Sequence, residues 1–215
     1  IFTHTAYEQD DLFKQWAGEK TEAGSKLVLG QHGGHYGIGL LSFSQDHETA
    51  ISDSYLTWGW DDPGFSNIRK SVFQRPFSRN LKHEPNGNLL IVMYAMPRYM
   101  HLLFSAALSS QWLDYFDDQL ELIASLPDII RSNSIVRISV NDYGWRVNDR
   151  LQASFNNLKI DNGIKDIQKQ IENCRLYLAT YNATTFLETL SYNIPTVIFW
   201  DPERWELKED VIPFF

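Results

Sequence analysis

The feature that most constrains the fold is a regular alternation of short apolar runs with segments of helical spacing. The apolar runs fall at residues 26–30, 89–94, 134–140, 175–180 and 196–200. Strands separated by helices pair in parallel, because each crossover returns the chain to the same end of the sheet. The sequence therefore predicts an α/β fold whose Rossmann-like sheet is open and mostly parallel.

Local patterns place further elements around these runs. In the first third, residues 1–6 predict the end of a strand and a turn, and Asp10 or Asp11 can cap a helix that Gly24 closes. The consecutive polar residues 45–48 predict a loop, and residues 51–58 alternate as a strand does.

In the remainder of the chain, we expect a helix over residues 110–126, with one apolar stripe of Trp112, Leu113, Phe116, Leu120 and Ile123. We also expect a break or short helical turn after Pro127, a short helix or turn at 151–155, a strand at 158–160, and helices at 164–173 and 184–192.

A polar connector with Pro and Gly, residues 80–88, predicts a boundary between two domains at 1–79 and 80–215. The first residue is Ile1 and the last lie in the apolar run 211–215, so we expect a fragment of a longer chain. The first domain would then be the end of a second α/β domain.

Composition limits the function classes. With 27 acidic against 19 basic residues and a net charge of −8, the chain lacks the basic surface that a nucleic-acid partner requires. The single cysteine, Cys174, excludes an internal disulfide and fits a reducing compartment. No run of about 18 apolar residues and no signal-like start is present. We expect a soluble, cytoplasmic protein, with contact to the inner face of the membrane left open.

A glycine-rich segment, Gln31-His32-Gly33-Gly34-His35-Tyr36-Gly37, follows the strand at residues 26–30. Glycines allow positive φ and close approach to a ligand, and two imidazoles can hold or move a proton. The carboxyl ends of parallel strands are where ligands bind. His32 and His35 are therefore candidate catalytic residues, and Gly33, Gly34 and Gly37 form a candidate ligand loop. The alternative is a turn whose histidines satisfy backbone groups.

A second candidate site follows the strand at 175–180, where polar residues open a helix. Free backbone N–H groups and hydroxyls at such a helix start bind anions, phosphate above all. The residues are Asn182, Thr184, Thr185 and Glu188. The alternative is that Asn182 or Thr184 caps its own helix.

A third cluster follows residues 134–140. Arg137 lies within the apolar strand and needs a partner, either a buried carboxylate or a bound phosphate. Asn141 and Asp142 can form a turn, and Tyr143 and Trp145 either stack on a ligand or belong to the core.

These sites predict a cleft in which a nucleotide-activated donor meets an acceptor. His32 or His35 would remove the acceptor's hydroxyl proton, and the helix start and arginines would hold the leaving phosphate. Metal binding by His32, His35 and His47 lacks the spacing of a metal motif. We therefore expect no metal and no other cofactor, the donor being a substrate.

Three segments carry a resemblance to a known group of enzymes. Residues 31–37, 51–60 and 182–188, the last followed by Asn193-Ile194-Pro195-Thr196, resemble transferases encoded in bacterial surface-carbohydrate gene clusters. Those are similar to the CDP-glycerol glycerophosphotransferases of teichoic acid synthesis and to capsule polysaccharide transferases. All have the two-domain GT-B glycosyltransferase architecture.

The resemblance implies that His32 is the base and that Arg137, Thr184, Thr185 and Glu188 face the nucleotide donor. The acceptor would be a glycan or a lipid-linked glycan. The related transferases often carry a His-Pro pair after the strand that holds Arg137, where this chain has Ser139-Val140 followed by Asn141-Asp142. The nucleotide of the donor is thus left open.

Two other functions use the same residues. A sugar-nucleotide epimerase of this architecture would also place imidazoles and carboxylates in a cleft. A non-catalytic nucleotide- or glycan-binding module would bind through the same helix start without chemistry at His32.

Overall fold

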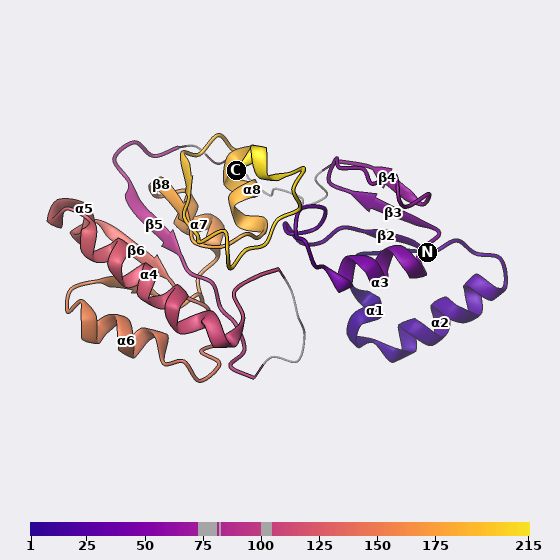
Figure 1. Cartoon of the computed structure of the whole chain (residues 1–215), viewed down its shortest axis with the longest axis horizontal. Coiled ribbons are helices and arrows are strands. Elements are labelled where there is room, and N and C mark those ends of the chain that lie inside the picture. The colour runs from indigo at the N-terminus through magenta and orange to yellow at the C-terminus, as the bar shows by residue number, and fades with distance from the viewer. Residues whose placement is uncertain (73–80, 82, 100–104) are drawn as a thin grey trace. The chain divides into compact units, whose positions relative to one another are not determined.

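The computed structural model describes residues 1–72, 81, 83–99 and 105–215, so Asn80 and Lys82 of the predicted connector lie outside the described residues. The chain forms two compact units, Ile1–Ser78 and Arg79–Phe215. Each unit has its own sheet (Figure 1), and every pair of strands among the described residues is parallel. The predicted α/β class with mostly parallel sheets is confirmed. No helix in the described part of the chain is long and apolar enough to cross a membrane.

The first unit has a four-stranded sheet in the order β1-β2-β3-β4. Its strands are β1 (Phe2–Thr3), β2 (Val28–Gly30), β3 (Ser54–Thr57) and β4 (Ile68–Lys70). Its helices are α1 (Ala6–Gln9), α2 (Asp11–Glu22) and α3 (Phe43–Ile51). Strands β1, β2 and β3 lie side by side in sequence order, and parallel strands are connected by right-handed crossovers. The connecting helices α1, α2 and α3 therefore lie on one side of the sheet, as Figure 1 shows.

The start of α2 is as predicted, since the Asp10 carboxylate accepts a hydrogen bond from Phe13 N. The helix buries little, however: only Ala17 is buried, while Leu12 and Trp16 are exposed. The core of this unit is small, and two of its five buried residues are aromatic. It consists of Leu27, Leu29, Tyr36, Tyr55 and Ile68.

The prediction of a loop at residues 45–48 was wrong, because these residues lie within α3. The reason is that the face α3 turns inward is polar: Gln45, Glu48 and Thr49 are buried. These side chains have partners, as Gln45 Oε1 accepts from Gly37 N at 2.7 Å and Thr49 donates to Gln45 O at 2.9 Å. Periodicity of apolar residues cannot reveal a helix of this kind. The following strand also begins later than predicted, at Ser54.

The second unit has a five-stranded sheet in the order β7-β6-β5-β8-β9. Its strands are β5 (Asn88–Val92), β6 (Ser134–Arg137), β7 (Lys159–Asp161), β8 (Cys174–Ala179) and β9 (Thr196–Ile198). Its helices are α4 (Trp112–Ser125), α5 (Asp128–Ser132), α6 (Val147–Ser154), α7 (Ile167–Ile171) and α8 (Thr184–Ser191), with short 3₁₀ turns at Ser109–Gln111 and Ile212–Phe214. All five strands predicted here are present.

The chain runs from β5 outward to β7, then crosses to β8 and runs outward the other way. The helices that connect the strands therefore cover opposite faces of the sheet. Helices α4 and α6 lie on one face, and α7 and α8 lie on the other (Figure 1). The residues of β5 alternate accordingly: Leu89 and Ile91 join the core beneath α4, and Leu90 and Val92 join the core beneath α8. Burial on both faces explains why β5 is a continuous apolar run.

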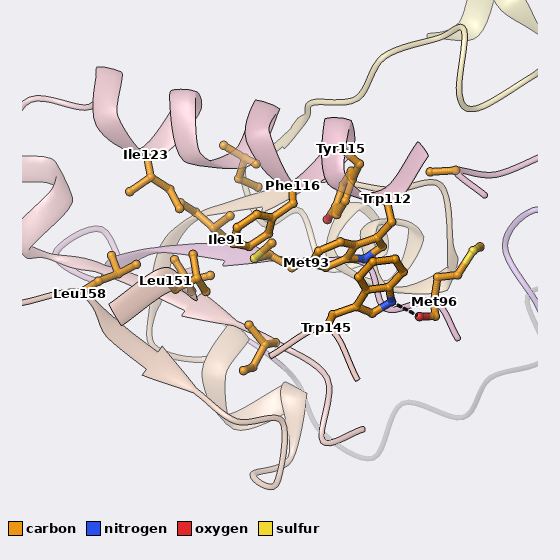
Figure 2. Packing of buried hydrophobic residues seen from close by; sticks show 14 of the residues in the cluster. Ile91, Met93, Met96, Trp112, Tyr115, Phe116, Ile123, Trp145, Leu151 and Leu158 are labelled. Atoms are coloured by element: carbon orange, nitrogen blue, oxygen red, sulfur yellow. Dashed lines mark hydrogen bonds between the residues drawn. The ribbon is translucent and has the colours of Figure 1, made fainter. Parts of the chain in front are cut away.

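Figure 2 shows α4 packed on the sheet, with Trp112 stacked between Phe116 and Trp145. The ring centroids of Trp112 and Trp145 are 4.3 Å apart, and Trp145 Nε1 donates to Met96 O at 2.8 Å. The predicted stripe was partly wrong: Leu113 is exposed, whereas Tyr115 and Gln119 are buried. Residues 112, 115, 116, 119 and 123 share one face at a spacing of three or four, and position 113 is turned about 100° away from Trp112.

A hydrogen-bonded chain fastens the carboxyl ends of β5 and β8 to α4. Tyr94 N donates to Tyr115 OH at 2.7 Å, Tyr115 OH lies 2.6 Å from Thr180 Oγ1, and Thr180 Oγ1 donates to Val92 O at 2.8 Å. Because Thr180 donates its proton to a carbonyl, Tyr115 must donate to Thr180. These hydrogen bonds hold β5 and β8 together where the strand order reverses. Open α/β sheets bind ligands at such a point.

Candidate functional site

The first candidate site is an imidazole–carboxylate pair. His32 lies directly beyond β2, and its Nε2 is 3.0 Å from Oε1 of Glu48 on α3. The same nitrogen is 2.7 Å from the hydroxyl of Tyr36 and 3.5 Å from Oε1 of Glu8 on α1. Three separate elements therefore meet at one ring nitrogen.

Glu48 has no exposed side-chain surface. Its Oε1 accepts hydrogen bonds of 2.6 Å from the hydroxyls of both Tyr7 and Tyr36. Burial by itself would raise the pKa of Glu48, but the hydrogen bonds from His32, Tyr36 and Tyr7 lower it below its ordinary value. Glu48 is thus a buried carboxylate held in its charged form.

The charge of Glu48 raises the pKa of His32. Burial lowers the pKa of His32, but the hydrogen bond to Glu48 and the charges of Glu48 and Glu8 raise it more, so the pKa lies above 6.5. The ring's hydrogen bonds within the described part of the chain all use Nε2. In the neutral ring the proton therefore belongs on Nε2, which leaves the lone pair on Nδ1.

His35 does not join this pair. Its ring packs against Tyr36 at a centroid distance of 4.5 Å. Burial, and then the nearby charge of His32, lower the pKa of His35 to about 4. The ring is consequently neutral at physiological pH. The structure places the ring nitrogen of His32 within hydrogen-bond distance of the Glu48 carboxylate, and the charge of Glu48 also acts on His35.

The glycines of the segment have different roles. Gly37 has a φ of +79°, and a Cβ there would lie 2.6 Å from the Trp60 ring. Gly33 and Gly34 are not among the residues with positive φ, so the expected backbone freedom is used only at Gly37. Gln31 ties the segment to the end of β3, since its Oε1 accepts from Trp58 N and Trp60 Nε1 and its Nε2 donates to Gly33 O.

Glu8, His32 and Glu48 also place their ligand atoms within 4.8 Å of one another, the spacing a metal ion would need. His35 and His47, which the sequence offered as companions of His32, are not part of this group. Hydrogen bonds already account for the positions of His32 and Glu48. The chemistry of the pair therefore needs no ion to explain it.

The second candidate site is the start of α8, directly beyond β8. The helix begins after Ala183, which has no side chain that can cap it. The alternative in which Asn182 or Thr184 is the helix cap is therefore wrong. Asn182 is 6% exposed, and its buried Oδ1 has no hydrogen-bond partner among the described residues. A helix start without a side-chain cap leaves backbone N–H groups that suit an anion, whereas the amide oxygen of Asn182 needs a hydrogen-bond donor.

The other predicted residues of this site lie along the same helix. Thr184 and Thr185 are half-buried, and Thr185 interacts with the buried hydroxyl of Tyr177. The structure thus brings Asn182, Thr184 and Thr185 to the carboxyl end of β8. Glu188 lies one turn further along α8 and is buried.

The whole chain, residues 1–215, matches the family model described as LIC12162 family transferase. The chain belongs to this transferase family. No curated protein matches the chain closely enough to count as a relative. Membership of a transferase family favours group transfer over the epimerase and binding-module alternatives, while donor and acceptor still have to be argued from the sites.

In this member of the LIC12162 family, Arg137 has a protein partner. Its Nη1 lies 2.6 Å from Asp161 Oδ2, and its Nη2 donates to the carbonyls of Gly163 and Lys165. The side chains of Arg137 and Asp161 are only 14% and 8% exposed. The buried-carboxylate alternative is the one observed, and contact of Arg137 with a donor stays a prediction.

Sequence reasoning missed four residues of the transferase's first site: Tyr7, Glu8, Tyr36 and Glu48. One signal was available for Glu48. Gln45, Glu48 and Thr49 stand at the spacing of one helical face, so a helix there would turn a polar stripe inward. Tyr7 and Glu8 carry no comparable signal, since their place beside His32 depends on how α1 packs.

Proposed function

We propose that the chain transfers a sugar or glycerol-phosphate group from a nucleotide-activated donor to a hydroxyl of a surface-polysaccharide acceptor, with His32 as the base. The acceptor is a glycan or a lipid-linked glycan. The observation that carries the proposal is the 3.0 Å contact between His32 Nε2 and the buried carboxylate of Glu48. A histidine held in this way is a typical general base.

The proton path follows from the tautomer. With its proton on Nε2, neutral His32 presents Nδ1 to the acceptor hydroxyl and takes its proton. The acceptor oxygen then attacks the transferred group, and the bond from that group to the leaving nucleotide phosphate breaks. Glu48 stabilises the imidazolium through the hydrogen bond from Nε2, and the two tyrosine hydroxyls keep the carboxylate ionised. The side chain of His32 is 26% exposed, so a substrate can reach the ring.

The leaving phosphate needs stabilisation of its negative charge, which the start of α8 can supply. The N–H groups of the first helical turn and the partial positive charge of the helix end both attract an anion. The hydroxyl of Thr185 and the amide of Asn182 stand at the same end of the helix. Two units that each carry a parallel α/β sheet also fit a GT-B glycosyltransferase architecture.

Binding measurements test the donor part of this proposal. Isothermal titration with CMP, CDP, UDP, GDP and ADP should show selective binding of one nucleotide. Thr185→Val should weaken this binding, whereas Ser191→Ala, a hydroxyl lost from the last turn of the same helix, should not. Binding of no nucleotide to the folded chain would rule out a nucleotide-activated donor. Conversion of a nucleotide sugar to its epimer in the absence of acceptor would instead establish the epimerase.

A further inference from the structure

A cavity of about 400 Å³ lies beyond the carboxyl ends of β5, β6 and β7 in the second unit. None of the described residues that line it belongs to β8 or α8, so it is separate from the candidate phosphate site. Trp112 and Trp145, the stacked pair of Figure 2, both contribute to its wall. A cavity of this size can hold a small organic ligand.

The lining offers hydrogen-bonding groups that the protein itself leaves unused. Asn148 and Asn162 line the cavity and are exposed, and the side-chain amide of neither makes a hydrogen bond to another described residue. Trp112 adds an indole N–H that is buried without an acceptor in the described part of the chain. Each amide offers two donors and an acceptor, the set that matches neighbouring hydroxyl groups of a ligand.

The charge of the lining argues against a phosphate. Two carboxylates, Asp142 and Asp149, face the cavity together with a single cation, Arg146. Arg146 is already paired with Asp149 at 2.8 Å. Burial by itself would raise the pKa of Asp142, but hydrogen bonds from the backbone N–H groups of residues 146, 147 and 144 together lower it below its ordinary value. The lining therefore carries one net negative charge and disfavours a negatively charged ligand.

The loop beside these residues is held in an uncommon shape. Tyr143 and Arg146 have φ values of +52° and +54°, a region that non-glycine residues seldom adopt. Asp142 fixes this shape by accepting hydrogen bonds from Arg146 N and Val147 N, and Arg98 donates to Gly144 O. The result is that the half-exposed ring of Tyr143 is kept at the cavity, where it can pack against the C–H face of a sugar ring.

We infer that this cavity binds a sugar unit that is neutral or carries an amino group. Amides and carboxylates would bind its hydroxyl groups, and Tyr143 would contact its apolar face. The inference deepens the proposed function, on which it rests, by naming the chemistry of one substrate: the sugar belongs either to the donor or to the acceptor glycan.

The test measures binding of simple sugars to the chain by NMR, using the side-chain amide signals of Asn148 and Asn162. The probes are the methyl glycosides of glucose, galactose, N-acetylglucosamine and glucosamine. At least one should shift both amide signals, and the variant Asn148→Ala/Asn162→Ala should bind it about tenfold more weakly. Asn157→Ala, an exposed asparagine that does not line this cavity, should bind it as the wild type does.

The outcomes separate this inference from the proposed function. If the double variant loses sugar binding but still binds its nucleotide, the cavity is the sugar site. Competition by a nucleotide sugar, but not by the free nucleotide, then assigns the donor sugar, and lack of competition assigns the acceptor. If no sugar shifts the two amides, or if a nucleoside alone does so, the sugar assignment is overturned whether or not nucleotide binds at α8.

Discussion

His32 Nε2 and Glu48 Oε1 lie 3.0 Å apart, and the glutamate side chain has no contact with solvent. A buried carboxylate costs several kcal/mol unless it is well hydrogen-bonded. Here the cost is offset by His32 and by the hydroxyls of Tyr7 and Tyr36. The first unit thus holds the charged carboxylate of Glu48 within a small core, and this charge raises the pKa of His32.

The first prediction concerns the pKa of His32. In the wild type it should exceed 6.5, because Glu48 stabilises the protonated ring. In Glu48→Gln this charge is gone while the burial and the charge of Glu8 remain, so the pKa of His32 should fall below its wild-type value. Titration of the imidazole signals by NMR measures both values. Glu19→Gln, on the exposed face of α2, is the control and should leave His32 unchanged. Equal pKa values in wild type and Glu48→Gln would show that the pair does not interact.

The second prediction concerns stability in acid. Because burial holds the pKa of His35 near 4, the unfolded chain binds a proton that the folded chain excludes between pH 6.5 and 4. Stability should therefore decrease as the pH falls through this range, by on the order of 3 kcal/mol from this residue. In His35→Gln the decrease should be smaller. Denaturant unfolding at a series of pH values measures it, and parallel curves for the two proteins would contradict the assignment.

His32 changes the stability of the fold with pH in the opposite direction to His35. Its folded pKa is raised, so its contribution is fully present below pH 6.5 and is lost as the pH rises through the folded value. Comparison of His32→Gln with wild type in the same unfolding series should show a difference that shrinks with increasing pH.

The third prediction concerns the Arg137–Asp161 pair of the second unit. Asp161→Asn should destabilise the protein by about 3 kcal/mol, because it leaves a largely buried guanidinium without its counter-charge. Replacing both residues, as Arg137→Met/Asp161→Leu, should cost less than Asp161→Asn alone. Denaturant unfolding of wild type, Arg137→Met, Asp161→Leu and the double variant completes a double-mutant cycle, and purely additive effects would show that the pair contributes no coupling.

The fourth prediction concerns the hydrogen-bonded chain at the ends of β5 and β8. Tyr115→Phe removes the hydroxyl that accepts from Tyr94 N and donates to Thr180, leaving both groups buried and incompletely paired. The expected loss of stability is about 1–3 kcal/mol. Tyr99→Phe, which removes a hydroxyl from an 89% exposed ring, is the control and should have no effect. If the two variants are equally stable, the chain does not fasten the strand ends.

The elements that the sequence predicted well are those with apolar interiors. β5 and β8 are buried on both faces, and α4 presents an apolar stripe to the sheet, so the spacing of apolar residues identifies them. Within α4, the same spacing assigned Leu113 to the core in place of Tyr115, because hydropathy favours leucine over tyrosine. The helical register decides otherwise, since Tyr115 stands one turn from Trp112.

The candidate site was predictable only in part, for a related reason. His32 could be found from glycines that follow a strand, but its partner Glu48 lies in a helix whose inner face is polar. For Arg137 the sequence indicated the need for a partner but not which residue it is. Only the pairing of β6 with β7 shows that Asp161 is that partner.

The most direct test of the central claim is release of free nucleotide from nucleotide-activated donors in the presence of a glycan or lipid-linked glycan acceptor, whose hydroxyl takes the transferred group, measured for wild type, His32→Gln and His47→Gln. His47 is the matched control, since it is an exposed histidine on the same helix as Glu48. With CDP-, UDP- and GDP-linked donors, the wild type should release nucleotide from one class. His32→Gln should lower this rate roughly 100-fold, and His47→Gln should not. Equal rates for wild type and His32→Gln, or no release from any donor by the folded chain, would contradict the account.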